Sequence, residues 1–407
     1  MLDAIGRCKK PVLLHVHVKH KDYLKNIEIM NNVFYNYEFN KLNIVHPDYI
    51  NYFLIVGFIV FVFLTSFAKF SEVERGSVKI LNRTHTQQLR GLAIFLVVLG
   101  HLWVHVSKIQ ANLVLSGEAV SLFLILSGFG LFTSVKGKNF LLKKFFIKRV
   151  KRVMVPYWIV TFFIILIDCL ILNKKISFNE ILLTFIGINI TEYLLKLDYV
   201  RWFVTFILLW YINFTIFYLF LKKYCLPFVL LIFSVLLIPI HYYYLDVGWY
   251  NFFSFPVGCL IALNYEKVQF ISNKNLNILL FFSIIYLFVF INITIFFGNG
   301  NLYSNLITKI PNILLVIFFD FSSVLFSISL IIVTYYFIKN NFHSFILSFL
   351  GKYSYELFLV HGIFLIKYNF FINSVEFYGV IFEFLIFFTS LLPIIVMLKF
   401  TTNKLNV

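Results

Sequence analysis

An arginine and a histidine spaced eleven residues apart are the residues of this sequence best suited to chemistry. Arg90 and His101 lie in the stretch TQQLRGLAIFLVVLGHLWVH. On an α-helix this spacing brings the two side chains within about 20° of one face, about 16 Å apart along the axis. An arginine can hold an anionic group, and an imidazole can take a proton from a hydroxyl near neutral pH. The alternative is an interfacial arginine and a hydrogen-bonded core histidine, and spacing alone leaves both open.

A second histidine on the same stretch raises the question of a metal site. His105 follows His101 by one helical turn, the spacing of two metal ligands on one helix face. No glutamate accompanies the two histidines as in zinc proteases, and the four cysteines lack the CxxC spacing of a zinc site. We therefore predict no metal.

The most basic part of the chain, residues 136–152, carries eight Lys and Arg residues and no acidic residue. Arg149 and Arg152 lie one helical turn apart, shortly before Pro156. Guanidinium groups bind phosphates through paired donors. Alternatively, such a segment only sets membrane topology and contacts anionic lipid headgroups. We assign most of the lysines to topology and the two arginines to binding a phosphate-bearing donor.

Ser354 and His361 are seven residues apart, so both can face the interior of a helical bundle. A Ser–His pair suggests a covalent acyl-serine. However, serine in a membrane helix usually forms hydrogen bonds with neighbouring helices. We keep both residues as candidates for binding substrate or supporting the site.

Composition defines the elements that must position these residues. Of 407 residues, 61% are hydrophobic and 13% are charged, against about 45–50% and about 25% in soluble domains. The apolar residues form blocks of about 20, the length of one membrane crossing. We predict an all-α, polytopic transmembrane bundle of ten core spans plus one extra N-terminal span, over residues 50–69, 89–108, 115–135, 155–173, 200–221, 225–245, 248–265, 276–297, 312–338, 352–371 and 377–399.

The net charge of +17 would suggest nucleic acid in a soluble protein. In a membrane protein, Lys and Arg gather in cytoplasmic loops, so residues 136–152 should be cytoplasmic. The alternating loops from residue 69 onward then place 21 basic residues inside and seven, Arg201 among them, outside. We predict no nucleic-acid partner. The connection at 174–199 contains an apolar stretch too short to cross, which lies at the interface or re-enters.

Six segments resemble a known family in order. RGLAIFLVVLGH is similar to the R-x10-H signature of the acyltransferase-3 family, integral membrane enzymes that acylate cell-envelope carbohydrates. The chain departs from the family at Gln87, where an aspartate is frequent, and at Ser121, where an acid is sometimes found. The other similar segments are AVSLFLILSGFGLF (119–132), FFIKRVKRVMVPYW (145–158), RWFVTFILLWY (201–211), FPVGCLIA (255–262) and LGKYSYELFLVHG (350–362).

This resemblance covers about residues 85–400 and implies a membrane acyltransferase domain there. Residues 1–49 would be a basic tail of unknown role, and 50–84 the extra span with a linker. The resemblance implies acetyl-CoA or another acyl-CoA as donor substrate, no permanently bound cofactor, and a carbohydrate acceptor. Trp202 becomes a further supporting candidate.

The resemblance also implies a multi-pass protein of a bacterial inner membrane, in contact with membrane lipids. Oligomeric state is left open. A transporter or flippase for a polar solute or glycan precursor is the alternative, although such folds often show internal repeats and the R-x10-H spacing occurs once.

Overall fold

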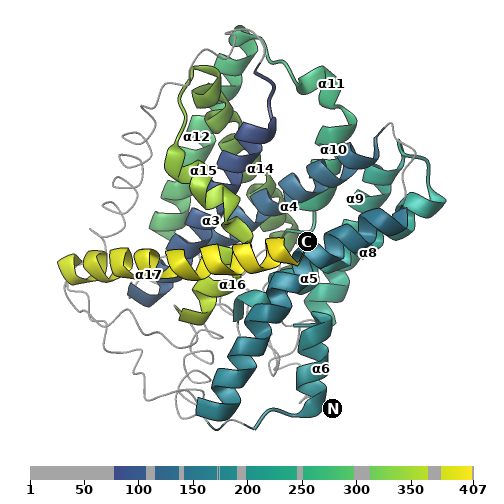
Figure 1. Ribbon diagram of the computed structural model, residues 1–407. Coiled ribbons are helices and arrows are strands. Elements are labelled where there is room, and N and C mark those ends of the chain that lie inside the picture. The colour runs from purple at the N-terminus through teal and green to yellow at the C-terminus, as the bar shows by residue number, and fades with distance from the viewer. Residues whose placement is uncertain are drawn as a thin grey trace, which may run out of the picture.

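The computed structural model describes residues 78–106, 115–136, 142–171, 173, 175–189, 199–244, 251–297, 312–364 and 377–405. Within these residues the regular structure is helical and contains no strand, which confirms the all-α class (Figure 1). The tail over 1–49 and the extra span over 50–69 lie outside the described residues.

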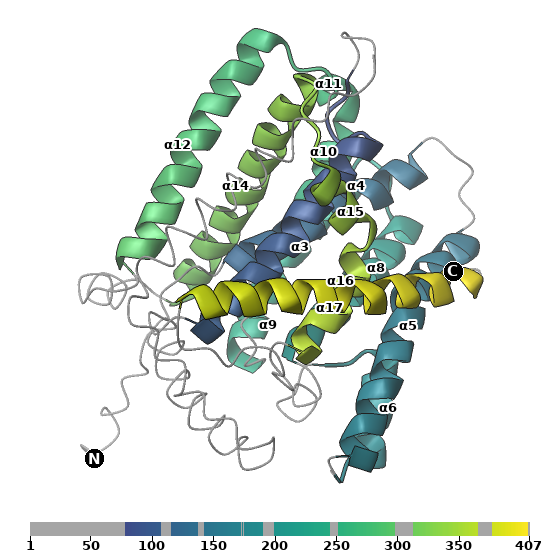
Figure 2. The same cartoon turned by 60° about the vertical axis from the view of Figure 1, so that its left-hand side comes forward.

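Several of the helices pack side by side in both views (Figures 1 and 2). In chain order they are α3 (Arg83–Val106), α4 (Leu115–Val135), α5 (Leu142–Leu166) with a π-helical end (Ile167–Ile171), α6 (Phe178–Ile186), the 3-10 turn η3 (Tyr199–Arg201), α8 (Trp202–Phe220), α9 (Leu226–Tyr244), α10 (Ser254–Leu263), α11 (Tyr265–Val268), α12 (Asn273–Phe297), α14 (Asn312–Lys339), α15 (Phe345–Lys352), α16 (Ser354–Gly362) and α17 (Phe377–Lys404).

Among the residues that the structure describes, five helical stretches are long and apolar enough to cross a bilayer, and two shorter apolar helices accompany them. The five are Gly117–Val135, Ile147–Ile171, Trp202–Phe220, Asn273–Phe290 and Val316–Lys339, and the shorter two are Leu226–Pro239 and Ser254–Leu263. Several apolar helices of this length make the chain a multi-pass membrane protein. The count of ten core spans plus one stays a prediction.

Helix α12 lies at the edge of the bundle (Figure 2). Several of its large apolar side chains are exposed. Phe281, Phe282 and Phe288 are each at least 60% exposed. A soluble protein rarely exposes a contiguous apolar surface of this kind. In a bilayer the same side chains contact lipid tails, so the pattern agrees with membrane insertion.

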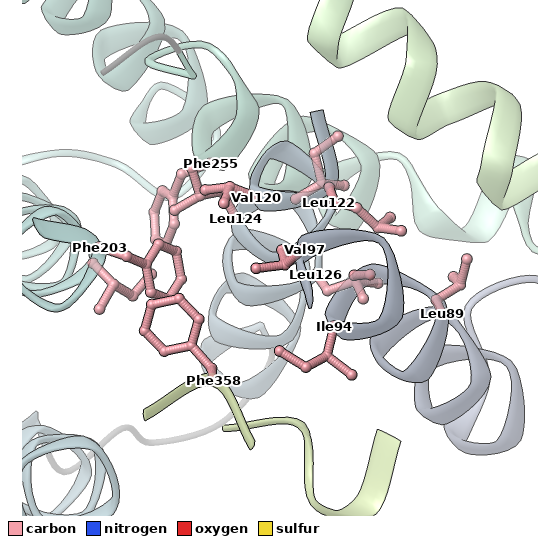
Figure 3. Packing of buried hydrophobic residues seen from close by; sticks show 14 of the residues in the cluster. Leu89, Ile94, Val97, Val120, Leu122, Leu124, Leu126, Phe203, Phe255 and Phe358 are labelled. Atoms are coloured by element: carbon pink, nitrogen blue, oxygen red, sulfur yellow. The ribbon is translucent and has the colours of Figure 1, made fainter. Parts of the chain in front are cut away.

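The core forms where α3 and α4 meet α10, α14, α15 and α16. Ile94 and Val97 of α3 are almost fully buried there (Figure 3). Phe358 of α16 meets Phe203 of α8 edge to face, with ring centroids 5.0 Å apart. Edge-to-face contacts of this geometry add to the stabilisation from burial alone. The aromatic contact therefore fixes α16 against α8.

Glycines bring two helix pairs into backbone contact. A β-carbon on Gly128 of α4 would overlap the carbonyl oxygen of Phe255 in α10, and one on Gly258 of α10 would overlap that of Ile125 in α4. Gly91 of α3 meets α15 in the same way. Small residues at such crossings permit close packing between membrane helices. The glycines therefore set the spacing between α4 and α10 and between α3 and α15.

A buried carboxylate holds the beginning of α10. Asp320 of α14 is fully buried, and its two oxygens accept hydrogen bonds from the backbone N–H groups of Phe252, at 2.6 Å, and Phe253, at 3.2 Å. The first N–H groups of a helix have no partner within the helix. Asp320 therefore acts as a side-chain cap supplied by another helix.

Replacing Asp320 by alanine should destabilise the protein. Each N–H left without an acceptor in the apolar core costs about 1–3 kcal/mol. Asp320→Asn keeps one carbonyl oxygen and should lose less. Thermal unfolding of the purified protein in detergent measures the difference, and equal melting temperatures for wild type and Asp320→Ala would contradict the capping role.

The structure adds detail to three sequence expectations. The segment 142–152 is not a loop before a span but the first part of α5. The apolar stretch in 174–199 forms α6, which ends at Gly187 in the left-handed conformation (φ 89°). Its last carbonyls accept hydrogen bonds from side chains of α5 and α8, including Tyr157 and Trp158. Irregular backbone at membrane depth requires such partners. An interfacial and a re-entrant placement of α6 both stay predictions.

Arg201 is the third case. The sequence counts it on the outer side, at the beginning of the span 200–221, and the structure adds that it is 1% exposed. Its guanidinium lies over the ring of Tyr157, 4.8 Å from the centroid, and donates a hydrogen bond to the hydroxyl of Thr161. A cation–π contact and hydrogen bonds offset part of the cost of burying the charge. Arg201 therefore belongs to the interior of the bundle.

Candidate active site

Helix α3 carries both residues of the R-x10-H spacing, as the sequence predicted. Arg90 is half-buried near the beginning of the helix, and His101 is half-buried eleven residues later. Three turns of regular α-helix separate them, so they share a face. Helix α3 is therefore the element that holds both side chains at a fixed separation.

The three arginines proposed for the donor lie within electrostatic range of one another. The charge of Arg90 interacts with those of Arg149 and Arg152 from α5, and the hydroxyl of Tyr211 from α8 interacts with Arg90 and Arg149. Among the described residues no carboxylate forms an ion pair with Arg90 or Arg152. Like charges repel, so an anion bound among these arginines would be held by their combined charge. The arrangement suits a ligand with several phosphate charges.

The second arrangement that the structure brings together is a pair of histidines from α3 and α16. His101 Nδ1 lies 2.9 Å from His361 Nε2, and the rings are nearly parallel, with an angle of 6° between their planes. His361 is fully buried. The sequence singled out each residue, but 260 positions separate them and nothing in the pattern pairs them.

Ser354 does not pair with His361. Its hydroxyl donates a hydrogen bond to the carbonyl of Gly351 at 3.2 Å, one turn earlier. Both ring nitrogens of His361 lie within hydrogen-bond distance of other partners. The geometry therefore does not support a covalent acyl-serine at Ser354. Its hydrogen bond joins the beginning of α16 to the end of α15.

Trp202 lies in an aromatic cluster at the beginning of α8. It is half-buried, and its ring meets those of Phe203 and Phe206, each with centroids 6.2 Å apart. Phe203 in turn contacts Phe358, one turn from His361. Trp202 thus supports the packing around α16.

A hydrogen bond explains why this chain has Gln87 where the family often has aspartate. The side-chain amide of Gln87 donates a hydrogen bond to the carbonyl of Ser348 in α15, at 2.8 Å. A carboxylate could not donate this bond. The other departure, Ser121, shares a hydrogen bond of 2.7 Å with Ser254 inside the core. Both positions hold helices together here.

The sequence analysis missed Arg201 as a residue of the interior. The available signal was an arginine next to an apolar block, because ionisable residues within membrane spans are costly and often functional. Metal binding has no support in the described residues, which contain no group of three or more His, Cys, Asp or Glu residues that could hold an ion. The side chain of His105 lies outside them.

Comparison with known proteins decides the family. Residues 87–400 match the family model Acyl_transf_3, described as an acyltransferase domain. The chain belongs to the acyltransferase-3 family. Searches among curated proteins and solved structures found no match. At family level the protein is therefore a membrane acyltransferase.

The motifs of this acyltransferase fall on elements that meet one another. The R-x10-H residues lie on α3, the two arginines of the basic segment on α5, and the last motif on α15 and α16. Contacts between α3 and both α15 and α16 join the first motif to the last. The matched region therefore folds around one candidate active site.

Proposed function

We propose that this acyltransferase moves an acetyl group from acetyl-CoA to a hydroxyl of a cell-envelope or exported glycan, in a bacterial inner membrane. The observation that carries the proposal is the arrangement along α3. Three arginines influence one another electrostatically at one end, and a histidine lies about 16 Å further along the same face of α3. An anionic donor can bind at the first point while its reactive end reaches the second.

Coenzyme A fits the arginine cluster by its chemistry. It carries a 3′-phosphate and a pyrophosphate, and a long pantetheine arm separates these from the thioester. Arg90, Arg149 and Arg152 would bind the phosphates through charge-assisted hydrogen bonds. The cluster lies in the basic region that topology assigns to the cytoplasm, where acyl-CoA is available.

In the proposed reaction His101 is the general base. It takes the proton from the acceptor hydroxyl while the oxygen attacks the thioester carbonyl. The carbon–sulfur bond then breaks, the acyl group stays on the acceptor oxygen, and the proton passes from His101 to the leaving thiolate. The products are the acylated glycan and free coenzyme A, so atoms and charge balance.

The direct test uses purified full-length protein with labelled acetyl-CoA and glycan extracted from the envelope. We expect label on the glycan as an ester that mild base removes. Release of coenzyme A without label on any glycan would contradict glycan acylation. Movement of glycan across proteoliposomes without acetyl-CoA would favour a transporter instead.

Removing either arginine of α5 should weaken donor binding. We expect Arg149→Gln and Arg152→Gln each to raise KM for acetyl-CoA by about 10- to 100-fold, because a hydrogen bond to a charged group contributes about 1.5–3 kcal/mol. The value of kcat should change little, since the arginines lie far from the thioester. Steady-state kinetics with saturating glycan measure both constants.

Lys151→Gln is the matched control for these variants. Lys151 lies between the two arginines on α5 and carries the same charge, and it is exposed, as Arg152 is. An equal rise in KM for Lys151→Gln would indicate general electrostatic attraction rather than a built site. A thioester of dephospho-CoA, which lacks the 3′-phosphate, refines the test. With this donor, substitution of the arginine that binds the 3′-phosphate should no longer raise KM.

A further inference from the structure

We propose that His361 is a positioning residue that fixes the tautomer of His101 and so leaves the lone pair of the neutral ring on Nε2. The inference deepens the proposed function and rests on it. It begins from the hydrogen bonds of two rings that come from opposite ends of the matched domain.

The backbone of α16 defines where His361 holds its proton. His361 Nδ1 lies 2.8 Å from the carbonyl oxygen of Phe358 and 3.1 Å from that of Leu357. A carbonyl oxygen can only accept a hydrogen bond, so Nδ1 must donate. A neutral imidazole carries one N–H, which leaves the lone pair of His361 on Nε2.

That lone pair defines the tautomer of His101. His361 Nε2 lies 2.9 Å from His101 Nδ1, so Nδ1 of His101 must carry the hydrogen between the two rings. The lone pair of neutral His101 then lies on Nε2, at the opposite side of the ring. The hydrogen bonds therefore run in one direction: His101 donates to His361, and His361 donates to the backbone carbonyls of α16.

This chain gives His101 what a general base requires. A base must present a lone pair to the substrate, and a third group usually holds its other nitrogen. His361 also accepts the hydrogen bond of the imidazolium that forms when His101 takes a proton. Because His361 is completely buried and packed against Phe358, with ring centroids 5.8 Å apart, it holds its partner in one orientation.

Two substitutions at position 361 separate positioning from packing. The amide oxygen of Gln reaches the place of Nε2 and can accept from His101, whereas Leu fills similar space and cannot. We expect His361→Leu to lower kcat by about 10- to 100-fold, as for other residues that orient a functional side chain, with KM for acetyl-CoA unchanged. His361→Gln should retain most of kcat.

A double variant tests whether the two histidines act as one unit. In a His101→Asn background, His361→Leu should cause no further loss, because the base it orients is absent. Independent losses that multiply would overturn the proposal. So would equal kcat values for the Gln and Leu variants when both keep the melting temperature of the wild type.

Nitrogen NMR of histidine-labelled protein tests the tautomer without any turnover. We expect His101 protonated at Nδ1 in the wild type and a mixture of tautomers in His361→Leu. His101 protonated at Nε2 in the wild type would overturn the positioning role. A wild type that shows the expected tautomer but transfers no acyl group would instead contradict the proposed function alone.

Discussion

Replacing His101 should abolish most acyl transfer while leaving the donor bound. We expect kcat to fall by about 10²- to 10⁴-fold in His101→Ala, the range for loss of a general base. KM for acetyl-CoA should stay near the wild-type value, because the arginine cluster lies about 16 Å away along α3. Steady-state kinetics on the purified protein measure the two constants separately.

His101→Asn distinguishes loss of the base from loss of the fold. The amide nitrogen of Asn lies near the place of Nδ1 and can donate to His361, so the buried contact survives without a basic nitrogen. Its kcat should fall as far as that of His101→Ala. Full transfer by the Asn variant would remove the assigned role of His101.

His343→Ala is the control for the histidine substitutions. His343 lies between α14 and α15, where it shares a hydrogen bond of 2.8 Å with Ser348, and burial lowers its pKa. It belongs to no part of the candidate site, so its removal should leave kcat unchanged.

The sequence predicted the parts of the site that lie close together in the chain. Arg90 and His101 share a helix, and so do Arg149 and Arg152, so helical periodicity placed each pair. The contact between His101 and His361 joins distant segments, and periodicity carries no information about such contacts. Arg201 shows the same limit, because its partners come from another helix.

The sequence also predicted the class of fold, because an excess of apolar residues in long blocks requires helices that span a bilayer. It failed where a helix continues past the apolar block. Residues 142–152 are basic, yet they continue the helix of the following block as α5. Lys and Arg are good helix formers, so charge marks the membrane boundary without ending the helix.

The glycines in the motifs lie at contacts between helices, which spacing along the sequence could not predict. Gly128 and Gly258 belong to two separate motifs, and each meets the backbone of the helix that carries the other. Gly91 and Gly351 relate α3 and α15 in the same way. The glycines of these motifs therefore mark, in part, the places where two helices must touch.

We expect Gly128→Ala to be among the most destabilising single changes in the protein. The added methyl group would overlap a carbonyl oxygen of α10, which is part of a helix and cannot rotate away. The two backbones would have to separate, and overpacking of this kind costs about 1–3 kcal/mol or more. Gly258→Ala should have a similar effect from the other side. Thermal unfolding in detergent and the yield of monodisperse protein measure the loss.

Gly130→Ala makes this prediction specific. Gly130 lies two residues along the same helix, and a β-carbon there would have no neighbouring atom within 4 Å. Alanine is favoured over glycine inside a helix by about 1 kcal/mol, so Gly130→Ala should keep or raise the melting temperature. If Gly128→Ala and Gly130→Ala melted alike, close contact between α4 and α10 would not be what requires glycine. If only Gly128→Ala and Gly258→Ala lose stability, the glycines of these motifs are explained by helix packing, independently of catalysis.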